Sequence, residues 1–246
     1  MTILAENLSK LEDSICAVCS TAGRSRSEVE LMAVSKTFPA DTILEAASLG
    51  LTLFGENRVQ EWSQKILELR PKSQSTKCNL IGHLQSNKAA RAVELFDGID
   101  SLDSLRLAER LNDAAQKLHK RLPVLIEVKL SLEPTKEGVD PGSDEAAKLL
   151  EALPDLNSLE TRGLMTIAPW GAPDAVTRTC FRNLRVLRDR WAQAHPRLNL
   201  DVLSMGMSGD FPLAIAEGAT RIRVGTALFG KRPKPAPGAV FNSEPV

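Results

Sequence analysis

The sequence has 246 residues and contains no tyrosine, although it has 7 phenylalanines and 3 tryptophans. No mechanism that needs a tyrosine as acid, base or nucleophile can therefore run on this chain alone. Long apolar runs are also missing, since none approaches the roughly 20 residues of a membrane span. Acidic residues interrupt the apolar pattern near the start of the chain at Glu6, Glu12 and Asp13. We therefore expect neither a secretory signal nor a membrane-spanning segment.

An excess of charge is absent as well, because 31 basic side chains balance 31 acidic ones. We therefore expect no general attraction to nucleic acid or to an anionic membrane. Cysteine is scarce, with 4 residues in the whole chain. Cys16 and Cys19 form a C-x-x-C pair in a helical pattern with no second pair of ligands, which favours ordinary thiols in a reduced, cytoplasmic protein. No group of histidines, cysteines and carboxylates has the spacing of metal ligands, so we predict no metal site.

The sequence is organised as an alternation of short apolar runs and amphipathic stretches. Apolar residues recur at intervals of three and four from Ile3 to Val18 and predict a first helix that ends near Gly23. Further helical patterns lie most clearly over 39–49, 103–119 and 175–194. Eight apolar runs predict buried strands, at 29–34, 51–54, 79–81, 98–101, 123–128, 161–167, 201–205 and 221–229.

A strand followed by a helix, repeated about eight times, is the pattern of a (β/α)8 barrel. Such a barrel occupies about 250 residues as one domain, and no linker divides this chain. We therefore predict the α/β class, with a single (β/α)8 TIM barrel over residues 1–231 and an extra N-terminal helix. Residues 232–246 contain four prolines (Pro233, Pro235, Pro237 and Pro245) and are predicted to form a disordered Pro-rich tail.

A lysine stands at the end of the first predicted strand. Lys36 follows the apolar residues 32–34, and side chains at this end of a barrel strand lie at the catalytic mouth. Desolvation lowers the pKa of a lysine, and a neutral amine can form a Schiff base with an aldehyde. Taken alone, the position is more typical of a lysine that reaches solvent.

Glycines and hydroxyl side chains gather at the ends of the last two predicted strands. Gly206, Ser208 and Gly209 follow the seventh run, and Gly225 and Thr226 lie within the eighth. Barrels commonly bind phosphate at this place through backbone N–H groups. The alternative is that the glycines serve only tight turns. A lysine at one strand end together with a phosphate cradle is what pyridoxal 5′-phosphate (PLP) requires.

Five segments, taken in order, resemble the pyridoxal phosphate homeostasis protein family, the YggS/PROSC group. They read Ala-Val-Ser-Lys at 33–36, Phe-Gly-Glu-Asn-Arg-Val-Gln-Glu at 54–61, Ile-Gly-His-Leu-Gln-Ser-Asn-Lys at 81–88, Gly-Leu-Met-Thr-Ile-Ala-Pro at 163–169, and Leu-Ser-Met-Gly-Met-Ser at 203–208 continuing to Phe-Gly at 229–230. The resemblance runs from about residue 3 to residue 231. It implies the barrel of the alanine racemase N-terminal domain, without that enzyme's second domain.

The resemblance also implies the site residues. It places PLP as a Schiff base on Lys36 and the phosphate on Ser208, Gly225 and Thr226. Arg223 matches the arginine that faces the pyridine nitrogen. Because an arginine stays protonated, it would keep that nitrogen unprotonated and make the ring a weaker electron sink.

Two further positions, Asn57 and Met165, are expected to line the pocket. The chain departs from many relatives at Cys78-Asn79, where they carry Trp-His, and at Lys129, where they carry Asn. Family members are thought to buffer or deliver PLP, and no enzymatic activity is established for them. We therefore predict a protein of intracellular PLP homeostasis that is not an enzyme, a monomer whose partners are PLP and apo PLP-dependent enzymes.

Two alternative functions remain open at this stage. The first is a PLP-dependent amino acid racemase, which needs a second acid or base on the opposite face of the ring. The related barrel enzymes use a tyrosine for this, so His83 or a lysine would have to replace it. The second is a PLP-responsive regulatory protein that contacts a partner through the arginine-rich stretch from Arg178 to Arg190, although a solvated face is the more typical role of such a stretch. The loop 133–138 is predicted to be a flexible lid. Lys136 within it is a candidate second lysine that handles the cofactor, although a solvated loop lysine is the more typical role.

Overall fold

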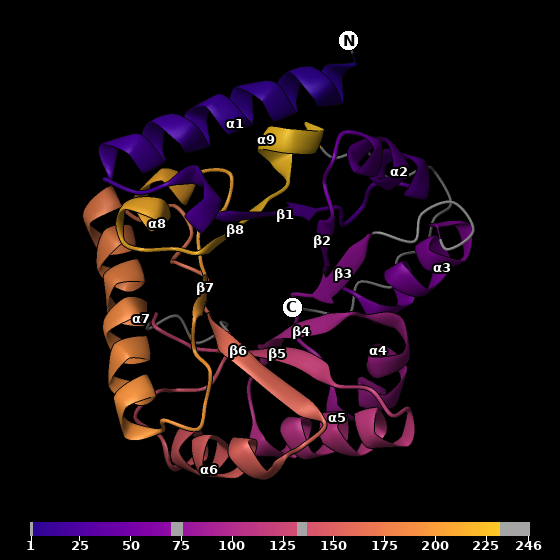
Figure 1. Ribbon diagram of the computed structural model, residues 1–246, viewed down its shortest axis with the longest axis vertical. Coiled ribbons are helices and arrows are strands. Elements are labelled where there is room, and N and C mark those ends of the chain that lie inside the picture. The colour runs from indigo at the N-terminus through magenta and orange to yellow at the C-terminus, as the bar shows by residue number, and fades with distance from the viewer. Residues whose placement is uncertain (1, 70–75, 132–136, 232–246) are drawn as a thin grey trace.

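The computed structural model describes residues 2–69, 76–131 and 137–231. Its strands form a closed parallel barrel in the order β1 to β8, which confirms the predicted (β/α)8 TIM barrel. Figure 1 looks into the ring of strands and shows the helices around its outside. The strands are β1 (Glu30–Val34), β2 (Leu53–Glu56), β3 (Lys77–Leu80), β4 (Gly98–Leu102), β5 (Leu122–Glu127), β6 (Leu159–Met165), β7 (Val202–Ser204) and β8 (Arg221–Val224). The predicted tail 232–246 and Lys136 lie outside the described residues.

The helices connect the strands and cover the barrel. The predicted first helix is α1 (Ile3–Thr21), which packs against α8 and α9 (Figure 1). Serine hydroxyls cap two helices, because Ser104 accepts from the N–H of Leu107 and Ser143 from that of Ala146. The other helices are α2 (Ala40–Ser48), α3 (Val59–Leu69), α4 (Ala89–Leu95), α5 (Leu105–Lys117), α6 (Asp144–Ala152), α7 (Asp174–Ala194), α8 (Phe211–Ala216) and α9 (Thr226–Phe229), with short 3-10 helices at Arg26–Glu28, Ser86–Lys88 and Leu153–Asp155. Among the described residues, none of these helices combines the length and the apolar character needed to cross a bilayer.

The eighth predicted strand, 221–229, is wrong in its second half. β8 ends at Val224, and the chain then turns into α9, where the N–H of Phe229 donates to the carbonyl of Gly225 over 2.8 Å. Leu228 is fully buried, and its carbonyl accepts a hydrogen bond from the side chain of Asn7 in α1. Leu228 is therefore buried by packing beneath α1 and not by the sheet, while Ala227 is exposed and Phe229 is half-buried. A short apolar run looks the same in both environments.

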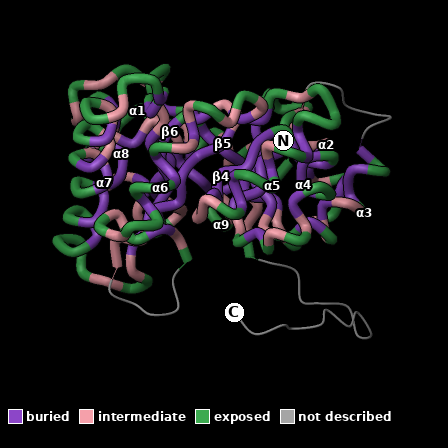
Figure 2. The backbone as a smooth tube through the Cα atoms, turned by 90° about the horizontal axis from the view of Figure 1, so that it is seen from below, coloured by how far each residue is buried: buried purple, intermediate pink, exposed green. Residues whose placement is uncertain are grey.

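The apolar core has two layers. The larger one lies between the barrel and the helices and includes side chains such as Phe54, Phe96 and Phe181. The smaller one lies inside the barrel and consists of Met32, Val34, Leu53 and Ile81. Figure 2 shows buried chain along the strands, with exposed segments on the outer turns of the helices and in the loops. Apolar packing on both sides of the strands makes the barrel wall a rigid support for the residues at its ends.

The rest of the barrel interior is crossed by a chain of polar side chains. Arg221 of β8 donates to Glu30 of β1 over 2.7 Å and to Asp100 of β4 over 3.0 Å. Asp100 also accepts from Asn79 of β3 over 2.8 Å. This lumen network joins four strands across the barrel. Asn79 thus has a structural role inside the barrel.

Candidate functional site

The lysine predicted as the anchor lies where the sequence predicted it. Lys36 comes two residues after the end of β1 and is half-buried. Because all eight strands are parallel, their carboxyl ends meet at one mouth of the barrel. Asn57 follows β2, Met165 ends β6, and Arg223 lies within β8. The strands β6, β7, β8, β1 and β2 are consecutive neighbours in the barrel, so the predicted site residues occupy one continuous arc of its mouth.

The predicted phosphate cradle is built from two loops that contact each other. The hydroxyl of Ser208, in the loop after β7, accepts a hydrogen bond from the N–H of Ala227 over 3.2 Å. Ala227 directly follows Gly225 and Thr226, and Thr226 is exposed at the start of α9. Hydroxyl groups and backbone N–H groups of the two loops therefore lie together, as a phosphate requires.

Two glycines are needed for this arrangement. Gly206 has a φ of +94°, and a Cβ there would lie 2.5 Å from the Cβ of Ala214 in α8. A Cβ on Gly225 would lie 3.2 Å from the carbonyl oxygen of Val34, two residues before Lys36. Gly209, in contrast, has open space around it. Packing therefore leaves no space for a side chain at position 206 and little at position 225, whereas it does not require a glycine at position 209. The predicted approach of these glycines to a phosphate stays a prediction.

Arg223 is a buried cation that is held by oxygen atoms of two neighbouring loops. Its guanidinium donates to the carbonyl and the hydroxyl of Ser204, over 2.7 and 2.9 Å, and to the carbonyl of Thr166 over 2.9 Å. Only 4% of the residue is exposed. Burial lowers the pKa of its guanidinium below the ordinary value, while the nearby carboxylates of Asp100 and Glu127 oppose this shift. The group still carries its charge at neutral pH, because an arginine loses its proton only far above that range.

The two residues expected to line the pocket differ in what they offer. Met165 is completely buried at the end of β6 and presents an apolar surface. Asn57 is half-buried, and its side-chain oxygen is buried without a hydrogen-bond partner among the described residues. An oxygen in that state costs free energy unless a ligand or water donates to it. Asn57 is therefore ready to accept a hydrogen bond.

Glu127 is a buried carboxyl group in the same mouth, and it is not among the site residues predicted from the sequence. It ends β5, only 5% of it is exposed, and its Oε2 atom has no hydrogen-bond partner among the described residues. Burial raises the pKa of this carboxyl to about 7, and the charge of Arg223 opposes the rise. A sequence signal existed, because Glu127 is the one charged residue in the otherwise apolar run 122–128.

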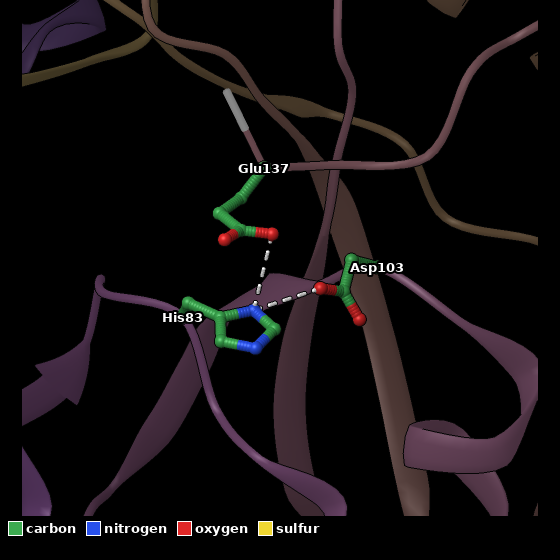
Figure 3. A group of neighbouring side chains, drawn as sticks. All are labelled: His83, Asp103 and Glu137. Carbon is green, nitrogen blue, oxygen red and sulfur yellow. Dashed lines mark hydrogen bonds and ion pairs between the residues drawn. The ribbon is translucent and has the colours of Figure 1, made fainter. Parts of the chain in front are cut away.

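His83 belongs to a second group of side chains on the opposite arc of the mouth. Its Nδ1 atom lies 3.1 Å from a carboxylate oxygen of Asp103 and 3.5 Å from one of Glu137, and Figure 3 shows the imidazole directed toward both. The three ligand atoms lie within 4.8 Å of one another. The group comes from the loops after β3, β4 and β5, so sequence spacing alone predicted no such cluster. It borders a cavity of about 320 Å³, which Lys129 also lines.

The arginine-rich stretch is separate from both groups. It lies on α7, and two of its arginines pair with Glu217 at the end of α8: Arg182 at 3.1 Å and Arg178 at 3.6 Å. These ion pairs tie α7 to α8. Part of the basic face predicted to be solvated thus serves the packing of the helices.

The residues present fit PLP. Lys36 supplies a primary amine, and the loops after β7 and β8 supply neutral hydroxyl and backbone donors of the kind that hold a phosphate. The unpartnered oxygen of Asn57 can accept a hydrogen bond, and Arg223 supplies a fixed positive charge. The donor set therefore matches each polar part of the cofactor.

The chain matches a known protein family over most of its length. Residues 7–233 match the family described as alanine racemase, N-terminal domain. Over 229 residues the chain is 38% identical to the pyridoxal phosphate homeostasis protein of Haemophilus influenzae, covering 93% of this chain and 96% of that protein. It is 40% identical over 234 residues to the protein of the same name from Escherichia coli K12, covering 94% of this chain and 98% of the relative.

Solved structures agree with this result. PipY of Synechococcus elongatus with PLP bound has a TM-score of 0.82 and 43% identity, covering 92% of this chain and 100% of that one. An alanine racemase of Clostridium difficile 630 has a TM-score of 0.74 at 15% identity, covering 94% of this chain but 57% of the enzyme. The second likeness shows a shared fold alone.

Proposed function

Since the chain belongs to the pyridoxal phosphate homeostasis protein family, whose barrel is that of the alanine racemase N-terminal domain, we propose that it binds PLP covalently on Lys36 and takes part in intracellular PLP homeostasis by buffering or delivering the cofactor. The observation that carries the proposal is the position of Lys36 in the same arc of the mouth as the donors of the loops after β7 and β8. A relative in the same family, PipY, has been solved with PLP bound.

Each residue of the arc has a distinct proposed task. When bound, PLP supplies an aldehyde that condenses with a primary amine, releasing water and forming a Schiff base. Lys36 provides that amine. Ser208, Gly225 and Thr226 orient the cofactor by holding its phosphate, and Arg223 faces the ring nitrogen. Asn57 and Met165 line the pocket: Asn57 accepts a hydrogen bond, and Met165 excludes water from one side.

We propose that the protein is not an enzyme. Arg223 donates hydrogen bonds to carbonyl groups on one side and keeps its charge, so it favours an unprotonated ring nitrogen. The chain also has no tyrosine with which to protonate a substrate from the opposite face of the ring. Alanine racemases work with an arginine at this place, so the missing tyrosine is the feature that supports holding the cofactor over racemising amino acids. The names of the relatives, which describe homeostasis, support the same reading.

The setting of this function is part of the proposal. The binding unit is the barrel of residues 1–231, acting as a monomer, and removal of 232–246 is expected to leave PLP binding unchanged. The four cysteines are free thiols, which supports a reducing compartment, the cytoplasm. The partners that we propose are apo PLP-dependent enzymes, which would receive the cofactor.

The visible absorbance of the Schiff base tests the proposal. Purified protein is mixed with PLP and compared with Lys36→Ala and with Lys129→Ala, a matched control that removes a lysine from the opposite arc of the mouth. We expect the wild type and Lys129→Ala to form the band and Lys36→Ala to lose it. An unchanged band in Lys36→Ala would overturn the assignment. Transfer to an apo-enzyme in the presence of a scavenger of free PLP then separates delivery from storage.

A further inference from the structure

Lys36 sits in a tight turn with an unusual backbone conformation. The N–H of Phe38 donates to the carbonyl of Ser35 over 3.1 Å, which makes Lys36 and Thr37 the two central residues of the turn. Thr37 has a φ of +72°. This region favours glycine and is strained for a β-branched residue, so the turn persists only where its surroundings hold it in place.

The surroundings that hold the turn are charged side chains of α3. The N–H of Thr37 donates to Oε1 of Glu61 over 2.5 Å. The ammonium group of Lys65 donates to the carbonyl of Ser35 over 3.0 Å and to the same carboxylate oxygen of Glu61 over 2.6 Å. One i,i+4 pair on α3 therefore grips the backbone on both sides of Lys36. Hydrogen bonds that involve an ionised group are the stronger ones.

Glu56 completes this arrangement from β2. Its Oε1 atom accepts from the hydroxyl of Ser35 over 2.6 Å and from Lys65 over 2.8 Å. Glu56 is fully buried and Lys65 is 8% exposed, so their ion pair is largely shielded from water and from screening by salt. The hydrogen bond from Thr37 to Glu61 lies at the exposed side of the network. Burial raises the pKa of Glu56, and the positive charge of Lys65 opposes the rise.

The network acts from behind the barrel wall. A Cβ on Gly55 would meet Met32 and Ile81, which belong to the apolar cluster inside the barrel. Gly55 therefore faces the lumen, and its neighbour Glu56 faces outward to α3, because successive residues of a strand point to opposite faces. Glu61 and Lys65 thus contact the backbone on either side of Lys36, from the outer face of the barrel.

We propose that Glu61 and Lys65, supported by Glu56, are positioning residues that fix the direction in which the strained turn presents the amine of Lys36 to PLP. The inference rests on the proposed function, because it assigns the geometry of the same anchor. Without the acceptor oxygen of Glu61, the turn loses the hydrogen bond that holds the N–H of Thr37 itself, while the bonds from Phe38 and Lys65 to the carbonyl of Ser35 remain. Thr37 can then relax from its left-handed conformation. The amine would then be presented in several directions, and a bound cofactor would lose its fixed orientation.

The decisive variant is Glu61→Met, which removes the acceptor but keeps the length of the side chain. Glu61→Gln is the conservative rescue, since its amide oxygen can still accept from Thr37. Glu68→Met is the matched control, because Glu68 is an exposed carboxylate on the same helix. Should Glu61→Met fail to fold, Glu61→Ser replaces it. The serine side chain is too short to reach Thr37, and its hydroxyl group can be hydrated.

Two measurements are made on each variant. The first is hydrogen exchange of the Thr37 amide in the cofactor-free protein, which reads the clamp itself. The second is the visible circular dichroism of the PLP-loaded protein relative to its absorbance, which reads a fixed orientation of the cofactor. We expect Glu61→Met to exchange at least tenfold faster and to lose more than half of the dichroism, with Glu61→Gln and Glu68→Met close to the wild type. Wild-type exchange and dichroism in Glu61→Met would overturn the proposal.

The outcome is separable from that of the proposed function. If the wild type forms no Lys36-dependent band, the proposed function fails, and exchange at Thr37 still tests the clamp. If the band depends on Lys36 but every Glu61 variant matches the wild type in exchange and dichroism, the positioning role alone is wrong.

Discussion

At the scale of the residue, the mouth of the barrel places three ionisable groups in different environments. Lys36 is half-buried on a strained turn, whereas Arg223 and Glu127 are buried below it. Arg223 has polar oxygens around it, but one oxygen of Glu127 has no partner among the described residues. Glu127 is therefore the group whose protonation is most sensitive to pH near neutrality.

Glu127 makes the stability of the cofactor-free protein depend on pH. Its pKa in the folded protein is raised from 4.5 to about 7. The folded state therefore binds more protons than the unfolded state between these values, and stability falls as pH rises through this window. The full effect corresponds to about 3 kcal/mol. We expect urea denaturation to show a fall of this order between pH 5 and pH 8 in the wild type relative to Glu127→Gln.

The exposed Glu109 provides the control for this prediction. Glu109→Gln should follow the wild-type pH dependence, because it removes a carboxyl group from the exposed face of α5 and leaves Glu127 in place. If Glu127→Gln showed the same pH dependence as the wild type, ionisation of Glu127 would cost no free energy in the folded protein, and the prediction would be wrong.

Single residues differ in how far the sequence could predict them. Lys36 and Gly206 lie at the ends of apolar runs, and Gly225 lies within one, so local order was sufficient to mark them as candidates. The hydrogen bonds of Glu61 to Thr37 and of Arg223 to Thr166 join residues 24 and 57 positions apart. Such contacts exist only after the barrel closes, and no local pattern predicts them.

At the scale of the element, the residues of the predicted phosphate cradle depend on the turns that follow β7 and β8. The loop from β7 to α8 is the clearest case, because Gly206 combines a φ of +94° with a contact that leaves no space for a Cβ. This turn sets where Ser208 meets Ala227. The cradle is therefore a property of two connected loops and not of a single residue.

Two glycine substitutions in this loop test whether the turn at Gly206, and not glycine content in general, is required. Gly206→Ala should destabilise the protein by about 2–4 kcal/mol, since it adds both left-handed strain and a steric overlap. It should also weaken the binding of PLP through displacement of Ser208. Chemical denaturation and titration with PLP measure the two effects.

Gly209→Ala is the matched control in the same loop, because it adds a methyl group where there is open space. Its stability should stay within about 0.5 kcal/mol of the wild type. Equal losses in both variants would mean that the loop tolerates no side chain at all, and the specific role of Gly206 would be wrong.

Helices and strands were predicted correctly where the spacing of apolar residues and the length of the run indicated the same kind of element. The first helix and the strand order followed from local patterns, whereas the run 221–229 merged β8 with α9. The period of apolar residues cannot tell which surface buries them. Leu228 is buried because α1 packs over α9, and this contact between distant segments cannot be read from the local sequence.

At the scale of the whole molecule, the lumen network holds the barrel together across its diameter. Arg221 and Asp100 come from β8 and β4, on opposite sides of the ring, and both are largely buried. Removal of Arg221 leaves Asp100 as a buried charge, and removal of Asp100 leaves the largely buried Arg221 with the partly exposed Glu30. The network thus contributes to the closure of the barrel that brings the site residues to one mouth.

Asp100→Ala should therefore destabilise the protein by about 3–5 kcal/mol. Asp113→Ala, which removes an exposed carboxylate from α5, should have little effect. Urea denaturation of both variants against the wild type measures the difference. A loss below 1 kcal/mol in Asp100→Ala would mean that Glu30 alone compensates Arg221.

The missing tyrosine can be interpreted at the scale of the whole chain. It covers 57% of a racemase whose barrel it shares at 15% identity. The chain has a lysine, a phosphate cradle and an arginine in this barrel, and it has no tyrosine for racemase chemistry of that kind. The molecule as a whole is suited to holding PLP.

The most direct test of this account is to locate the bond between PLP and the protein. Borohydride reduces a Schiff base to a stable amine, after which proteolysis and mass spectrometry identify the modified lysine. Wild-type protein loaded with PLP should carry the phosphopyridoxyl group on Lys36, and Lys36→Ala should carry none at that peptide. A modification found mainly on another lysine, or none in the wild type, would contradict the central claim.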